Sequence, residues 1–203
     1  LTILRTGVEQ PLEFTLTRAH IVIPSVTSKM LDNNIAYIQL TIFGDTTTSD
    51  FHNQLSQLMA QNPSGIILDL RDNGGGYLNS GVSVASEFID SGVILYEQSG
   101  DGSRTDYPAV SGGLATTIPL VVLVNGNTAS ASEIVSGAIQ DDGRGQLVGV
   151  LTYGKGSVQN WIPLSDGGTA RITIAKWLTP NGRTIDKIGL TPDVVVTMTQ
   201  DDT

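Results

Sequence analysis

The chain has no cysteine among its 203 residues, and it has only two histidines, His20 and His52. The absence of cysteine excludes a thiol nucleophile, a disulfide framework and a zinc site built on thiolates. The two histidines lie far apart in the sequence and belong to no cluster of metal ligands. We therefore expect no metal site in this protein.

Basic residues are also scarce, because 11 lysines and arginines stand against 20 acidic residues and leave a net charge of −9. Nucleic-acid binding needs a basic face that neutralises phosphates, so we expect no nucleic-acid partner and no docking on anionic lipid. The sequence also lacks a run of about 20 apolar residues, so we expect no membrane span in it. The chain length is sufficient for one substantial hydrophobic core.

Buried runs rich in β-branched residues alternate with helical patterns up to about residue 150. The alternation predicts an α/β fold with parallel strands and crossover helices. Strands are expected at residues 35–42, 65–71, 93–96, 119–124 and 146–150, and helices at residues 51–59, 82–89 and 131–139. Later strand patterns at residues 158–164, 169–177 and 194–198 predict an antiparallel extension.

The N-terminal segment has the pattern of a β-hairpin, because residues 1–5 and 13–18 alternate around a turn at residues 7–11. A lone hairpin is marginally stable. It either belongs to a sheet that is mostly absent or joins the sheet of the core. Since the chain begins at Leu1 inside a strand-like pattern, we expect it to be a fragment of a longer protein, with a linker near residues 19–27.

Ser130 lies where a buried strand turns into a helix, since helical spacing begins at Ala131. Backbone N–H groups at the start of a helix have no intrahelical partner. An oxyanion formed when a serine attacks an amide would meet them there. This position predicts Ser130 as a nucleophile. A simple helix N-cap is the alternative.

Lys155, which stands between Gly154 and Gly156, is the best candidate for a base, because neither histidine lies in a glycine-rich turn. A lysine acts as a base only when its pKa falls well below about 10.4, which requires desolvation. Small flanking residues permit that crowding, and a solvated loop is the alternative. Residues 149–156 nearly match a phosphate-binding loop, but Gly156 replaces the Ser/Thr that would hold magnesium, so we do not expect nucleotide binding.

Three consecutive glycines, Gly74, Gly75 and Gly76, directly follow the expected strand at residues 65–71. Glycine permits positive φ and lets bare N–H groups approach a ligand closely. A flexible turn is the alternative. The charged residues near these turns are expected to brace the loops: Arg71, Asp72, Glu133, Asp141 and Arg144.

The blocks N-G-N-T-A-S-A-S-E-I, Q-D-D-G-R and T-Y-G-K-G-S-V-Q, in this order, closely resemble the carboxyl-terminal processing (tail-specific) serine peptidases. The resemblance implies that Ser130 is the nucleophile, that Lys155 is the general base 25 residues later, and that Gln159 orients the lysine. The segment L-R-D-N-G-G-G resembles the loop of that family that lines the oxyanion hole. It implies that the amide of Gly75 or Gly76 acts together with that of Ala131.

The same resemblance implies a ClpP/crotonase-like core over residues 20–203, preceded at residues 1–19 by the last hairpin of a truncated PDZ domain. The implied activity is that of a serine endopeptidase with a Ser-Lys dyad. It would cut proteins with apolar tails near their C-terminus through an acyl-enzyme, without a cofactor. The implied location is extracytoplasmic: periplasm, cell envelope or thylakoid lumen. A homo-oligomer is left open.

Two other functions are compatible with parts of the same sequence pattern. One is a catalytically silent peptide-binding relative, or a truncated core that is inactive without its PDZ domain. Intact Ser130, Lys155 and Gln159 argue against the silent relative, but they are compatible with a competent core that is inactive because it is truncated. The other is acyl transfer or hydration of a thioester on a crotonase-like fold, for which the sequence has no coenzyme-binding signal.

Overall fold

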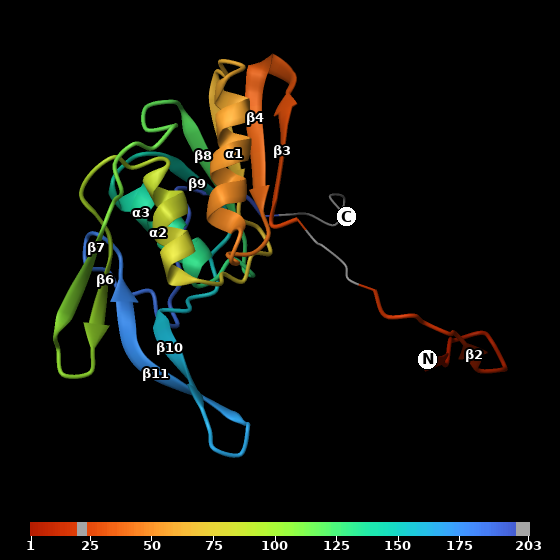
Figure 1. Cartoon of the computed structure of the whole chain (residues 1–203). Helices are drawn as coiled ribbons and strands as arrows, with labels where there is room; N and C mark the ends of the chain where they lie inside the picture. The colour runs from red at the N-terminus through yellow and green to blue at the C-terminus, as the bar shows by residue number, and fades with distance from the viewer. Residues whose placement is uncertain (20–23, 198–203) are drawn as a thin grey trace.

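The computed structural model of the protein describes residues 1–19 and 24–197 and has a mixed α/β architecture (Figure 1). The main sheet has six strands in the order β12-β9-β8-β5-β4-β3. All neighbours in it are parallel except the β3–β4 pair. Its strands are β3 (Val26–Leu31), β4 (Ile35–Leu40), β5 (Gly65–Asp69), β8 (Leu120–Val124), β9 (Gln146–Gly149) and β12 (Val194–Val195).

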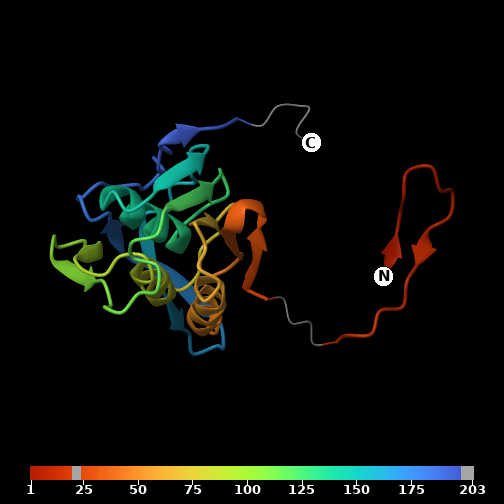
Figure 2. The ribbon, with the colours of Figure 1, turned by 90° about the horizontal axis from the view of Figure 1, so that it is seen from above.

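Helices α1 (Thr47–Met59), α2 (Leu78–Ser86) and α3 (Ala131–Asp141) connect strands of this fold. Figure 2 shows α1 and α2 side by side along one face of the main sheet. The apolar stripe of α1 is buried there through Phe51, Leu55 and Leu58, as the spacing of an amphipathic helix requires. The central strands β5 and β8 are buried at most positions, and their remaining residues, Ile67, Val121 and Leu123, are partly buried.

A second sheet has four antiparallel strands in the order β10-β11-β6-β7. Its strands are β6 (Val93–Ser99), β7 (Arg104–Pro108), β10 (Ser157–Pro163) and β11 (Thr169–Leu178). In Figure 1 the β10–β11 hairpin projects from the body of the molecule, and it follows directly after the Lys155 turn. The antiparallel extension predicted after Lys155 is therefore present.

The structure departs from the sequence predictions in three strands. β6 does not join the parallel sheet, because it pairs with β7 and β11 instead. β12 is not part of the antiparallel extension, since it pairs in parallel with β9; the predicted end of this strand, at Met198, lies outside the described residues. β3 falls partly in the expected linker and adds an antiparallel edge to β4. The long loop after β6 contains β7 and so includes a small hairpin.

The N-terminal hairpin consists of β1 (Thr2–Ile3) and β2 (Leu12–Glu13), which pair antiparallel as a separate two-stranded sheet. Both strands are shorter than the sequence pattern predicts. Residues 1–19 are exposed except for Leu12, which is partly buried. The hairpin therefore does not join the sheet of the core.

Candidate active site

Ser130 is the N-cap residue of α3, and its backbone has φ 57° and ψ −117°. A serine pays a steric cost of about 1–3 kcal/mol to adopt a backbone conformation that favours glycine. Such strained turns between a strand and a helix present a side chain outward from the end of a sheet. The turn is fixed by its neighbours, because Thr128 Oγ1 donates to the carbonyl oxygen of Leu70 at 2.9 Å.

Lys155 lies in a turn whose backbone is held on both sides. Its N–H donates to Glu133 Oε2 at 2.9 Å, and its carbonyl oxygen accepts the indole N–H of Trp177 at 3.0 Å. Gly154 has φ +83°, and a methyl group there would lie 2.8 Å from the nitrogen of Gly189. The glycine is therefore required by the close approach of another backbone segment.

The carboxylate of Glu133 connects the Ser130 turn to the Lys155 turn. Its side chain is completely buried. Oε2 accepts the N–H groups of Ser130 and Lys155, both at 2.9 Å. Oε1 accepts the hydroxyl of Thr152 at 2.6 Å and the N–H of Gly154 at 2.7 Å. One ionisable group on the first turn of α3 thus fixes both predicted catalytic residues relative to each other.

The triple-glycine segment lies against the Ser130 turn. A methyl group at Gly75 would be 2.7 Å from Ser130 Cβ and 2.8 Å from the nitrogen of Ala131. A methyl group at Gly76 would be 2.1 Å from the carbonyl oxygen of Phe43. Both glycines have positive φ, whereas Gly74 has neither a close neighbour nor a positive φ. The segment is therefore tightly packed at its second and third glycines only.

The buried side chain of Asn73 holds this loop. Its Nδ2 donates to the carbonyl oxygen of Leu40 at 2.7 Å, and its Oδ1 accepts the N–H of Gly75 at 2.9 Å. Within residues 24–197, the N–H groups of Gly76 and Ala131 have no protein acceptor. These two donors, beside Ser130, are free to bind a ligand oxygen, while that of Gly75 is occupied.

A pocket of about 330 Å³ brings Ser130, Lys155 and Gln159 together. The amide Nε2 of Gln159 donates to Thr173 Oγ1, its cross-strand partner, at 3.3 Å. The far wall of the pocket comes from the second sheet through Trp161, Arg171 and Trp177. Sequence reasoning missed these three residues because strand pairing alone brings them to the pocket.

Burial lowers the pKa of Lys155 below its ordinary value, and the positive charge of Arg171 lowers it further, whereas the carboxylate of Glu133 opposes the shift. A lower pKa increases the fraction of neutral amine, which is the form that accepts a proton. Lys155 is therefore desolvated, as expected from the sequence for a lysine that acts as a base. The positive charge of Arg171, which also lowers this pKa, could not be predicted from the glycines around Lys155.

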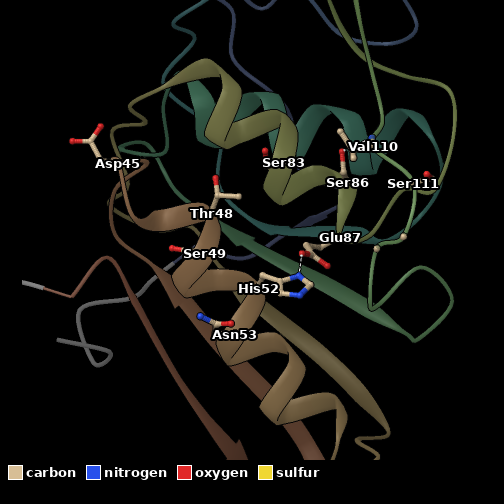
Figure 3. Close-up of a pocket in the computed structure, with 12 residues that line it drawn as sticks. Asp45, Thr48, Ser49, His52, Asn53, Ser83, Ser86, Glu87, Val110 and Ser111 are labelled. Atoms are coloured by element: carbon tan, nitrogen blue, oxygen red, sulfur yellow. Dashed lines mark hydrogen bonds and ion pairs between the residues drawn. The ribbon is translucent and has the colours of Figure 1, made fainter.

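His52 belongs to a different pocket, which is formed by α1, α2 and the loop around residue 112 (Figure 3). Its Nδ1 lies 2.6 Å from Glu87 Oε1, and Glu87 Oε2 accepts the N–H of Leu114 at 3.0 Å. This pocket shares no lining residue with the Ser130 pocket. His52 therefore does not serve Ser130. His20 lies outside the described residues.

The charged residues expected to brace the loops do so. Arg71 pairs with the buried carboxylate of Asp69 at 2.6 Å. Asp72 Oδ1 accepts the side-chain amides of Asn125 and Asn127, at 2.9 and 2.8 Å. The Asp72 contacts tie the chain just before the glycine segment to the loop before Ser130, whereas the Arg71–Asp69 pair braces the end of β5.

The other two braces act at the far end of α3. Asp141 pairs with Arg183 and accepts the N–H of Asn181 at 2.8 Å. Arg144 donates to the carbonyl oxygens of Phe88, Ala115 and Ile118. Both residues therefore hold loops and lie outside the Ser130 pocket.

No helix in the described part of the chain is long and apolar enough to cross a membrane. Over the same residues, His, Cys, Asp and Glu side chains form no group of three that could hold a metal ion.

Residues 34–196 match the sequence model of a known protein family, peptidase family S41. The chain belongs to peptidase family S41. Over 200 residues this S41 chain is 42% identical to a carboxyl-terminal-processing protease of Synechocystis sp., covering 97% of the chain and 47% of that protein. It is 36% identical to the carboxy-terminal processing protease CtpA of Bacillus subtilis, covering 94% of the chain and 41% of that protein.

Two solved structures share the fold of the chain. The S41 chain superposes on a photosystem II D1 C-terminal processing protease with a TM-score of 0.80 and 36% identity, covering 89% of this chain and 50% of that one. A lipoprotein from Streptococcus agalactiae shares the fold at 18% identity and a TM-score of 0.73, covering 86% of this chain and 66% of that one. The chain spans about half the length of the curated relatives it matches.

Gly75→Ala should destabilise the protein far more than Gly74→Ala does. At Gly75 a methyl group meets the Ser130 turn, and the positive φ is unfavourable for alanine, so we expect a loss of about 1–3 kcal/mol in the free energy of unfolding. At Gly74 no atom of residues 1–19 or 24–197 lies within 4 Å of an added methyl group, so the change should be neutral or slightly stabilising. Urea unfolding of both variants measures this difference, and equal stabilities would contradict the packing described above.

Glu133→Gln should lower the free energy of unfolding by about 2–4 kcal/mol, because one acceptor oxygen becomes an N–H₂ donor facing backbone donors. The control is Glu97→Gln, because the Glu97 carboxylate accepts the hydroxyl of Tyr107 and, among the described residues, no other hydrogen bond. This substitution should change stability by about 0.5 kcal/mol or less. Urea unfolding would again be measured. If Glu133→Gln and Glu97→Gln had the same free energy of unfolding, the four hydrogen bonds of Glu133 would not stabilise the two turns as described.

Proposed function

We propose that this chain is the catalytic core of a serine endopeptidase that cuts protein substrates near their C-terminus with a Ser130–Lys155 dyad. The observation that carries the proposal is the shared restraint of the two residues by Glu133, together with the pocket that both line. The printed names of the relatives, which are carboxyl-terminal-processing proteases, support the reaction class.

In this mechanism neutral Lys155 takes the proton of the Ser130 hydroxyl while Oγ attacks the carbonyl carbon of the scissile peptide bond. The N–H groups of Ala131 and Gly76 stabilise the resulting oxyanion, and Gly75 supplies the close packing that brings this backbone to Ser130. Lys155 then gives the proton to the leaving amine as the C–N bond breaks. Water, deprotonated by Lys155, hydrolyses the acyl-enzyme and restores Ser130.

Gln159 acts as a positioning residue in this proposal. Its Nε2 already donates to Thr173, which fixes the orientation of the amide and leaves Oε1 as an acceptor. Oε1 would accept a hydrogen bond from Lys155 Nζ and hold the amine near Ser130. Both residues line the same pocket, which supports this arrangement.

The wider assignments are also proposals. Residues 1–19 would be the end of a PDZ domain, and residues 20–203 a ClpP/crotonase-like peptidase core. The separate pairing of β1 with β2 supports this division. Substrates would be proteins with apolar C-terminal tails. An extracytoplasmic location is supported by relatives whose names describe them as chloroplastic.

Ser130→Ala and Lys155→Ala should each lower kcat by about a thousandfold or more, and the double variant should lose little beyond that, because the two groups act as a unit. Cleavage of an unfolded protein with an apolar C-terminus, with products mapped by mass, is the measurement. Lys29→Ala, an exposed lysine on β3, is the matched control and should keep full activity. Full activity in Lys155→Ala would refute the dyad, and binding without cutting by the wild type would indicate a silent peptide-binding protein.

The kcat/KM of the wild type should fall as the pH drops through the pKa of Lys155, because protonation removes the lone pair that accepts the serine proton. Since burial and Arg171 lower that pKa, the midpoint of the acid limb should lie below 10.5, the ordinary value for lysine. Initial rates on one peptide across the pH range test this, with circular dichroism as the control for unfolding. A rate that stays level from weakly acid to alkaline pH would count against a lysine base.

A further inference from the structure

The Ser130 pocket is lined by two basic side chains, of which Arg171 keeps its positive charge when Lys155 is the neutral base, and the buried carboxylate of Glu133 lies behind the lysine turn. Lys155 and Arg171 line it, and no Asp or Glu is among its lining residues, although the whole chain has a net charge of −9. The remaining wall is mostly apolar or aromatic, including Ile134, Trp161 and Trp177. A cationic pocket in an acidic protein is suited to an anionic group carried on an apolar ligand.

Arg171 is held in place without being paired to a carboxylate. It stands opposite Trp161 in the β10–β11 ladder, and its guanidinium carbon lies 5.2 Å from the centre of the Trp161 ring. This is the range of a cation–π contact. Within residues 24–197 it makes no ion pair and no side-chain hydrogen bond, so its N–H donors remain available.

Three other arginines of the core differ from Arg171 in this respect, and the fourth, Arg104, differs in its place. Arg71 and Arg183 pair with carboxylates, and Arg144 binds three backbone carbonyls. Arg104 lies over Tyr96 at 3.9 Å in the same sheet, but it does not line the Ser130 pocket. Arg171 therefore combines an uncommitted guanidinium with a place beside the proposed nucleophile. Its repulsion of the Lys155 amine, which lowers the pKa of Lys155, indicates that its charge acts on the reacting groups.

Resting on the proposed function, we propose that Arg171 is a specificity-determining residue that binds a carboxylate of the peptide substrate close to the scissile bond. The planar guanidinium forms paired hydrogen bonds with a carboxylate, and Trp161 keeps its plane in place for that contact. The carboxylate is either the free C-terminus of a short tail or the side chain of an Asp or Glu near the cut. The apolar wall of the pocket accepts the neighbouring side chains of such a tail.

The experiment compares four peptides of one apolar sequence that contains the cleavage site. The first ends in a free carboxylate and the second in an amide. The third and fourth are amides with Glu or Gln at one position beside the cut. Wild type, Arg171→Gln, Arg171→Lys and the matched control Arg104→Gln are assayed at alkaline pH. The preference is taken as the ratio of kcat/KM between paired peptides within each variant, so a change in the pKa of Lys155 affects both members of a pair alike.

We expect wild type and Arg104→Gln to cut one carboxylate peptide about ten- to a hundredfold faster in kcat/KM than its neutral partner. Arg171→Gln should cut both at the rate of the neutral peptide, and Arg171→Lys should keep part of the preference. A preference between the first two peptides identifies the free C-terminus as the source, and one between the last two identifies the acidic side chain. Equal rates on all peptides in the wild type, or an unchanged preference in Arg171→Gln, would overturn the proposal.

Calorimetric titration of the same peptides onto the Ser130→Ala protein separates this proposal from the catalytic one. If the wild type cuts nothing, the proposed function fails. In that case the role of Arg171 would still be supported if the Ser130→Ala protein binds the carboxylate peptides more tightly than the neutral ones and the Ser130→Ala/Arg171→Gln protein does not. Cleavage without any carboxylate preference in rate or binding would keep the peptidase and refute the role of Arg171. Circular dichroism shows whether each variant is folded.

Discussion

The buried carboxylate of Glu133 is the restraint on which the candidate site depends. Two oxygens accept three backbone N–H groups and one hydroxyl, from the Ser130 turn and from residues 152–155. Such charge-assisted bonds are stronger than neutral ones, and a buried carboxylate would be costly without them. The arrangement turns two loops that are separate in the sequence into one rigid unit.

The strained backbone of Ser130 and the close packing around it also define the candidate site. The backbone of Ser130 adopts a conformation that serine alone would avoid, and it persists because Glu133, the Leu70 carbonyl and the glycine segment surround it. Gly75 and Gly76 have no side chains and so allow the backbone to approach Ala131 and Phe43. The free N–H groups of Gly76 and Ala131 beside Ser130 are the result of this packing.

The second sheet gives the site its far wall and its electrostatic character. The chain enters β10 directly after Lys155, so the same turn that positions the lysine also starts the hairpin that carries Gln159, Trp161 and Arg171. Trp177 on β11 binds the carbonyl oxygen of Lys155 and joins this wall to the lysine turn. Burial by these residues and the charge of Arg171 together lower the pKa of Lys155.

Sequence by itself determined the local elements and the residues of the central motifs. Hydrophobic periodicity is a local property, so it predicted α3, β5 and β8 within about two residues of their observed bounds, although α1 begins earlier, at Thr47, than the pattern indicated. The glycine and serine turns indicated Ser130 and Lys155 as candidates. Tertiary structure alone decided the partners of β3, β6 and β12, because strand pairing joins residues far apart in the chain. For the same reason it decided the positions of Glu133 and Arg171. A charged residue shows its role only when the fold determines which groups lie beside it.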